Sequence, residues 1–189
     1  GLGDVYKRQL YERTFTNEGQ LTIKDGGKLT MRDGTLTNKN GGSATIESGG
    51  VLDVHGYGSI DKTSTISGVF TNNGTMNLMR EYYGGNGNLT YTGSDINGNG
   101  TINIASGSIL TLTNNTNLNS QTINMTNGHF SADSGYTGGE IIGYGYLRGN
   151  LGGPITIANG TMRFENDTSL LSGIGTMDVS DTGILELYE

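Results

Sequence analysis

Apolar residues in this chain occur in pairs separated by a single residue, and such pairs recur along most of its length. The pairs are Leu21/Ile23, Leu29/Met31, Ala44/Ile46, Leu52/Val54, Met76/Leu78, Leu89/Tyr91, Ile102/Ile104, Leu110/Leu112, Ile123/Met125, Ile155/Ile157, Met162/Phe164, Met177/Val179 and Leu185/Leu187. A period of two indicates a short β-strand with one face turned inward. Gly precedes most pairs, as at 26–27 and 49–50, and permits sharp corners. The pattern predicts short strands joined by tight turns.

A longer phrase, N/G-x-G-T followed by such a pair, favours a solenoid over a sandwich of hairpins. It occurs at 72–78, 98–104, 158–164 and 173–179, with a looser copy at 17–23. The apolar residues that close successive units are Ile23, Ile46, Leu78, Ile104, Met125, Ile157 and Val179. Most steps between these positions lie in the low to middle twenties, which matches the length of one solenoid coil. The steps from Ile46 to Leu78 and from Met125 to Ile157 are longer, and we interpret them as coils that carry a looped-out insertion.

The fold class expected from these steps is all-β: a right-handed parallel β-helix (β-solenoid) of about seven coils with two looped-out insertions. Irregular coils of more than twenty residues favour the right-handed form, because a left-handed hexapeptide helix needs a strict six-residue period. Stacked coils pair their strands with one another at about 4.8 Å and align like residues in columns.

Composition and charge exclude several other classes of protein. The chain has 34 Gly, one Pro and no Cys, and its net charge is −7. Without Cys there is neither a disulfide framework nor a thiolate zinc site. The acidic balance argues against nucleic acid as a partner, and no apolar run approaches the roughly 20 residues of a membrane helix. We expect no cofactor and no metal, since Leu89 stands where the calcium nonapeptide would need Asp.

The G-T phrases, the corner T-N-N-G-T at 71–75 and the block at 88–114 resemble the passenger regions of bacterial autotransporter adhesins. This resemblance covers roughly residues 14 to 189. It implies a pectin-lyase-like right-handed β-helix, displayed extracellularly at the bacterial outer surface. It also implies a host or bacterial surface glycan or protein as partner, or self-association. Membrane contact would come only through a C-terminal barrel, which this sequence lacks.

The opening stretch G-D-V-Y-K-R-Q (3–9) breaks the repeat. It resembles the translation of a transposase adapter used to prepare sequencing libraries. We therefore expect residues 1–9 to be adapter-derived and residues 10–189 to be a β-solenoid fragment of a larger secreted protein, and we exclude the former from reasoning about the fold.

The candidate ligand-binding residues are tyrosines associated with the two long steps. The first step contains segment 64–73, which leads to a strand followed by segment 79–88, and the second step contains segment 127–154. These tyrosines are Tyr82, Tyr83, Tyr136, Tyr144 and Tyr146. Loops on a rigid scaffold often carry recognition, and tyrosine rings suit stacking on sugars. The alternative is that these rings pack over the coil or fold inward as additional core.

We expect a non-catalytic stalk or binding segment rather than an enzyme. The alternative is a β-helical polysaccharide lyase or glycoside hydrolase, which would gather carboxylates on one outer face. The local candidates for such a group are Asp53 with His55 and Asp61, and Asp178 with Asp181 and Glu186. Asp53 and His55 alternate with Val54, so we expect both to face solvent.

Threonines at outward strand positions, among them Thr22, Thr30, Thr111, Thr113 and Thr156, suit a solvent-facing strand. A ladder of the ice-binding kind needs coils of nearly equal length, and the unequal steps between successive units argue against one.

Overall fold

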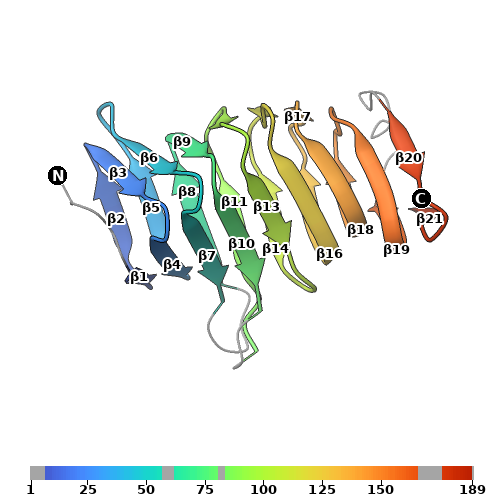
Figure 1. Ribbon diagram of the computed structural model, residues 1–189, viewed down its shortest axis with the longest axis horizontal. Coiled ribbons are helices and arrows are strands. Elements are labelled where there is room, and N and C mark those ends of the chain that lie inside the picture. Colours follow the sequence, from blue (N-terminus) through green and yellow to red (C-terminus); the bar gives the residue numbers. More distant parts are fainter. Residues whose placement is uncertain (1–6, 57–61, 81–83, 166–175, 189) are drawn as a thin grey trace.

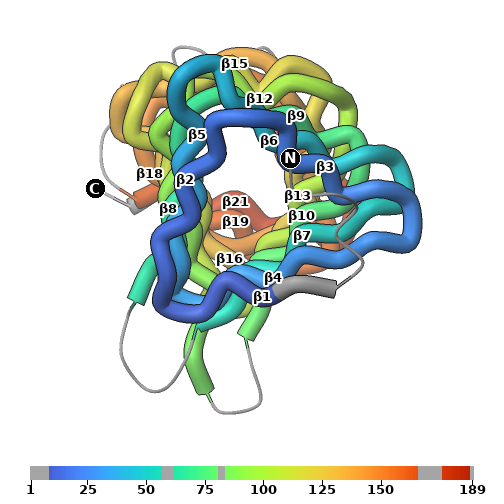
Figure 2. Tube along the Cα trace, turned by 90° about the vertical axis from the view of Figure 1, so that its left-hand side faces the viewer, coloured from blue at the N-terminus to red at the C-terminus, as the bar shows by residue number. Residues whose placement is uncertain are grey.

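The computed structural model describes residues 7–56, 62–80, 84–165 and 176–188. Within these residues the chain forms strands and no helix, and all strand pairs are parallel. The strands stack as three-sided coils along one axis, with β1 at one end and β20 and β21 at the other (Figure 1). Viewed from the N-terminal end, the chain passes clockwise from β1 to β2 to β3 as it recedes (Figure 2). The fold is a right-handed parallel β-solenoid, as predicted.

Each side of the solenoid is a stack of parallel strands. The first side contains β1 (Lys7–Tyr11), β4 (Lys28–Arg32), β7 (Val51–His55), β10 (Thr75–Met79), β13 (Thr101–Ile104), the first halves of β16 (Thr122–Ala132), β18 (Glu140–Gly149) and β19 (Ile155–Glu165), and β20 (Met177–Val179). The second side contains β2 (Thr14–Asn17), β5 (Thr35–Asn38), β8 (Thr63–Ser67), β11 (Asn88–Tyr91), β14 (Ile109–Leu112), the second halves of β16, β18 and β19, and β21 (Ile184–Tyr188). The third side contains β3 (Gln20–Ile23), β6 (Ser43–Ile46), β9 (Val69–Asn72), β12 (Ile96–Asn97), β15 (Thr116–Asn117) and β17 (Tyr136–Thr137).

Coil length varies along the stack. On the first side the chain advances by 24, 26 and 21 residues between the successive register partners Asp53, Asn77, Asn103 and Asn124. Farther on, Met125 pairs with Gly143 and Gly143 with Ile157, so the coils there are considerably shorter. About seven coils close around the axis, as predicted, and β19, β20 and β21 extend the stack beyond them.

These pairings correct our interpretation of the two long steps. The step from Ile46 to Leu78 joins residues on different sides, β6 and β10. The step from Met125 to Ile157 contains two short coils. Segments 64–73 and 127–154, which we expected to be looped out, consist mainly of strands β8, β9, β17 and β18 and the second half of β16.

Two of the connections between the first and second sides are longer than the others. They comprise residues 56–62 and 80–87, whereas β4 and β5 are joined by residues 33–34 alone. Both connections are tightly packed at their described ends. A Cβ on Gly56 would lie 2.2 Å from the Asn86 carbonyl oxygen, and one on Gly87 would lie 2.3 Å from that of Val54. Glycine is required at both positions because backbone occupies the space of a side chain.

The recurring N-x-G-T phrase forms a hydrogen-bonded corner. The Asn17 side chain accepts a bond from the Gly19 amide at 3.2 Å, and Asn72 accepts one from Gly74 at the same distance. Asn72 also donates to Gln121 Oε1 at 2.8 Å. Because both asparagines are buried, these bonds satisfy polar groups that would otherwise be costly to bury.

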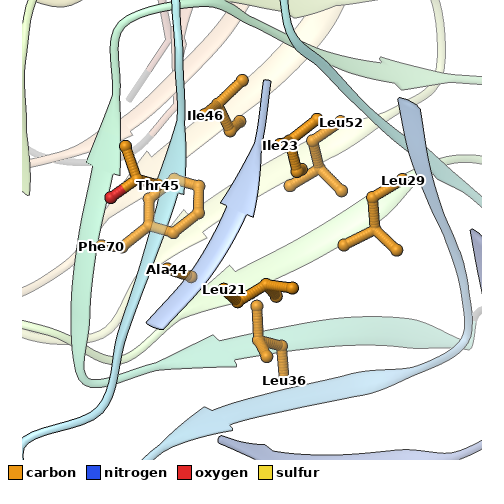
Figure 3. Close-up of a pocket in the computed structure, with 9 residues that line it drawn as sticks. All are labelled: Leu21, Ile23, Leu29, Leu36, Ala44, Thr45, Ile46, Leu52 and Phe70. Carbon is orange, nitrogen blue, oxygen red and sulfur yellow. The ribbon is translucent and has the colours of Figure 1, made fainter. Parts of the chain in front are cut away.

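The interior is a continuous apolar column. On the first side the stacked inward residues are Leu29, Leu52, Met76, Ile102, Ile123, Ile141 and Ile155, each at most 3 % exposed. Burying one such side chain contributes about 1.5–3 kcal/mol. Figure 3 shows how Leu21, Leu36 and Phe70 converge with their neighbours in the first coils, where the remaining space does not admit a water molecule. The interior of these coils is filled by their own side chains.

Strand β1 begins at Lys7 and pairs in register with β4. The last three residues of the stretch 1–9 therefore belong to the first described strand. Their expected origin in an adapter stays a prediction, as does the boundary at residue 10.

In the described part of the chain no helix is long and apolar enough to cross a membrane.

Candidate functional site

A ladder of amide side chains runs along the outer face of the first side. Asn77 donates to Asp53 Oδ1 at 2.8 Å, Asn103 donates to Asn77 Oδ1 at 2.8 Å, and Asn124 donates to Asn103 Oδ1 at 3.1 Å. The residues occupy one register position on β7, β10, β13 and β16. Each amide therefore points its donor toward the N-terminal end of the stack, where the row ends on a carboxylate.

Asp53 is closely surrounded rather than open to solvent, which corrects our expectation for this residue. It is 2 % exposed and forms an ion pair with Lys28, while His55 Nε2 lies 3.9 Å from its Oδ2. Burial alone would raise the pKa of Asp53, but its interactions with His55, Lys28 and Asn77 together hold it well below its usual value. The carboxylate is thus ionised at neutral pH and structural in character. Asp61, the third member of this predicted group, lies outside the described residues.

The second predicted group of acids is split between two sides. Asp178 lies in β20, which pairs with the first half of β19, whereas Glu186 lies in β21, which pairs with the second half. Asp181 is an exposed turn residue between these strands. The fold does not bring the three acids together as one site.

The predicted tyrosines differ in accessibility. Tyr136 is 2 % exposed and packs edge-on against Phe130, with 5.2 Å between ring centres; burial raises its pKa. It is a core residue, so its assignment to ligand binding is wrong. Tyr144 and Tyr146 are half-buried on β18. Tyr82 and Tyr83 lie outside the described residues.

Tyr146 is the centre of a cluster on the outer face of the second side. Its ring stacks on His129, with 4.3 Å between ring centres and 12° between planes. Arg163 Nη1 donates to the Tyr146 hydroxyl at 2.7 Å, and Arg163 Nε donates to Glu186 Oε2 at 2.8 Å. His129, Tyr146, Arg163 and Glu186 occupy one register position on four successive strands. We call these four residues the Tyr146 row.

Further charged residues accompany the Tyr146 row. Arg148 lies two residues beyond Tyr146 and pairs with Asp133 at 3.3 Å. In the next coil Glu165 is the register partner of Arg148. Burial lowers the pKa of His129, and the nearby Glu165 carboxylate opposes this effect only in part. His129 is therefore neutral at pH 7, which allows its ring to stack on Tyr146 without a charge to solvate.

This cluster can recognise a polyhydroxylated or anionic ligand. The two aromatic rings offer stacking area, and Arg148 and Arg163 offer rigid forks of N–H donors. The sequence suggested Tyr146 from its aromatic neighbours. It offered no reason to select His129, Arg148 or Arg163, which come together only because the two short coils place them in register.

In the described residues no group of three or more His, Asp or Glu side chains is arranged to hold a metal ion. Comparison with known proteins finds no matching family, no similar curated protein and no similar solved structure.

Proposed function

We propose that the chain is a non-catalytic stalk and binding segment of a secreted or surface-displayed bacterial adhesin. The observation that carries this proposal is the Tyr146 row, an aromatic and arginine-bearing surface on a rod whose described interior is packed with apolar side chains. Its partner would be a host or bacterial surface glycan or protein.

The form of the rod supports a role as a stalk. Nine described strands stack on the first side, which at about 4.8 Å per step amounts to roughly 40 Å. Every step is bridged by backbone hydrogen bonds, by inward apolar columns and, over four strands, by the amide ladder. A stack cross-linked in this way holds a surface at a fixed distance and orientation.

The alternative is a polysaccharide lyase or glycoside hydrolase. The structural reason to consider it is that acidic residues, Glu186 and Asp133, lie on or beside the second side. Glycosidases need one carboxyl group that acts as an acid and one that acts as a base or nucleophile. Glu186 is engaged by Arg163 and Asp133 by Arg148, which favours charge pairing between coils over catalysis.

A glycan array with the purified chain tests the proposal, with Tyr146→Ala as the test variant and Thr156→Ala, an outward substitution on the first side, as its control. We expect the chain to bind a subset of glycans, Tyr146→Ala to lose that binding and Thr156→Ala to retain it. Equal binding by all three proteins would overturn the assignment of the Tyr146 row. Release of reducing ends or unsaturated products from a bound polysaccharide would favour the enzyme instead.

A further inference from the structure

The second side changes character along the solenoid. At its C-terminal end lies the charged Tyr146 row, whereas its first five strands present threonine at nearly every outward position. Each strand carries Thr-x-Thr or Thr-x-Ser, with the intervening apolar residue turned inward. The ten outward residues, which we call the threonine array, are Thr14, Thr16, Thr35, Thr37, Thr65, Ser67, Thr90, Thr92, Thr111 and Thr113.

The array forms two rows in register. Strand pairing aligns Thr14, Thr35, Thr65, Thr90 and Thr111 directly with one another. In the second row Thr16 pairs with Thr37 and Thr37 with Ser67. Backbone bonds from Thr92 to Ile66 at 3.0 Å and from Thr113 to Tyr91 at 3.2 Å continue this row.

Unequal coil lengths do not disturb this register, contrary to our expectation. A longer stretch of chain separates Thr35 from Thr65 than separates Thr90 from Thr111, yet both pairs are register partners. The difference lies largely in the connection between the first and second sides, which comprises residues 56–62 between β7 and β8 but only residues 105–108 between β13 and β14. Irregular steps along the chain therefore do not prevent a regular threonine ladder on this side, and our expectation was wrong.

The spacings of the array are fixed by β geometry. Neighbouring strands place threonines of one row about 4.8 Å apart, and two residues along a strand separate the rows by about 6.7 Å. Both distances lie close to repeats of the oxygen lattice of hexagonal ice. Because Thr is β-branched, its χ1 angle is restricted, so little side-chain freedom remains to be lost on binding.

The chemistry of the array also suits an uncharged water lattice. It contains no charged residue, and each threonine offers one methyl and one hydroxyl group. In the first row none of the five hydroxyls bonds to another described residue, so all five are available to water. The aromatic rings of these strands, Phe15 and Tyr91, occupy the inward positions, where they cannot stack on a sugar.

We propose that the threonine array is an ice-binding surface, whose ligand is the ordered water of an ice crystal. The array lies on different coils from most of the Tyr146 row, so this inference does not rest on glycan binding. An adhesin that carries this array would bind ice in addition to a surface glycan or protein.

Thermal hysteresis and ice-affinity partitioning of the full chain test the inference. We expect the chain to arrest growth of an ice crystal and to enter slowly growing ice, and Thr90→Lys, at the centre of the array, to lower both activities severalfold. The matched control is Thr45→Lys on the third side, where a single threonine row (Thr22, Thr45, Thr71) occupies outward positions. Circular dichroism establishes that both variants fold.

If Thr90→Lys does not fold, Thr90→Val removes the hydroxyl at nearly constant volume and should still reduce activity. Absence of thermal hysteresis and partitioning in the unmodified chain would overturn the inference, as would equal losses in the Thr90 and Thr45 variants. Binding to crystalline cellulose or chitin without any binding to ice would also overturn it and would reassign the array to such polymers.

Discussion

Asn77 donates a 2.8 Å hydrogen bond to Asp53 across adjacent coils, although 24 residues of chain separate them. The two residues share a register position on β7 and β10. With Asn103 and Asn124 they form a row in which each amide donates toward the carboxylate. Because a carboxylate only accepts hydrogen bonds, it suits the acceptor end of this row, and the charge there strengthens the bond it receives.

Asn103→Leu should destabilise the solenoid by about 1–3 kcal/mol. The substitution removes two hydrogen bonds, each with a net contribution near 1 kcal/mol, and leaves Asn77 and Asn124 with one partner fewer. Urea denaturation followed by circular dichroism measures the change. The same substitution at Asn99, an exposed corner residue, is the control and should stay within about 0.5 kcal/mol of the parent. Equal effects at both positions would mean that the ladder contributes nothing of its own.

Asp53→Asn should cost about 1.5–3 kcal/mol at pH 7, the usual contribution of a hydrogen bond to a charged group. The folded state lowers the pKa of Asp53, so the stabilisation is complete above the unfolded pKa of about 3.9. It is lost progressively as pH falls from there toward the folded pKa. The free-energy difference between parent and variant should therefore be larger at pH 7 than at pH 3.

Urea titrations of both proteins at the two pH values check this prediction. Taking the difference between parent and variant cancels the titration of the other carboxylates. A difference that is the same at pH 7 and pH 3 would contradict an ionised, hydrogen-bonded Asp53.

The fold class could be predicted from the sequence because the interior repeats. Pairs such as Leu52/Val54 and Ile102/Ile104 mark the inward strand positions, and the N-x-G-T phrase marks corners where an asparagine such as Asn72 caps a glycine amide. Which side a pair belongs to is not encoded locally. Ile46 and Leu78 look alike in sequence but lie on the third and first sides, and this ambiguity produced the false long step between them.

The candidate site was less predictable, because outward neighbours depend on register across coils. Tyr136 and Tyr146 have similar local surroundings rich in glycine, yet one enters the core on the third side and the other stacks on His129. A threonine ladder was rejected from the sequence for the same reason. Its regularity arises from strand pairing, while irregular corner lengths hide it in the linear sequence.

Gly87→Ala should destabilise the chain by about 1–3 kcal/mol, the usual cost of overpacking. The added Cβ would lie 2.3 Å from the Val54 carbonyl oxygen and 2.5 Å from the Met79 amide nitrogen. Both are backbone atoms, which cannot move aside as the end of a flexible side chain can. Gly19→Ala is the control, because no neighbouring atom lies within 4 Å of its Cβ position. Thermal unfolding compares the two variants. A Gly87 variant as stable as the control would show that the base of the connection can open at little cost.

Leu187→Lys should reduce self-association of the isolated chain. Leu187 is 62 % exposed although it pairs with Phe164, which is 3 % exposed in the preceding coil. Leu185 is also exposed, and in the described residues β21 pairs only with β19. An apolar surface and an open strand edge at one end of a rod favour stacking of copies.

Sedimentation velocity over a concentration series measures this association. We expect the parent chain to form larger species as concentration rises and Leu187→Lys to shift them toward monomer. Val69→Lys is the matched control, because Val69 is 54 % exposed but lies on the third side, away from the end of the stack. A parent chain that stays monomeric throughout, or equal effects of the two lysines, would contradict association through the β21 end.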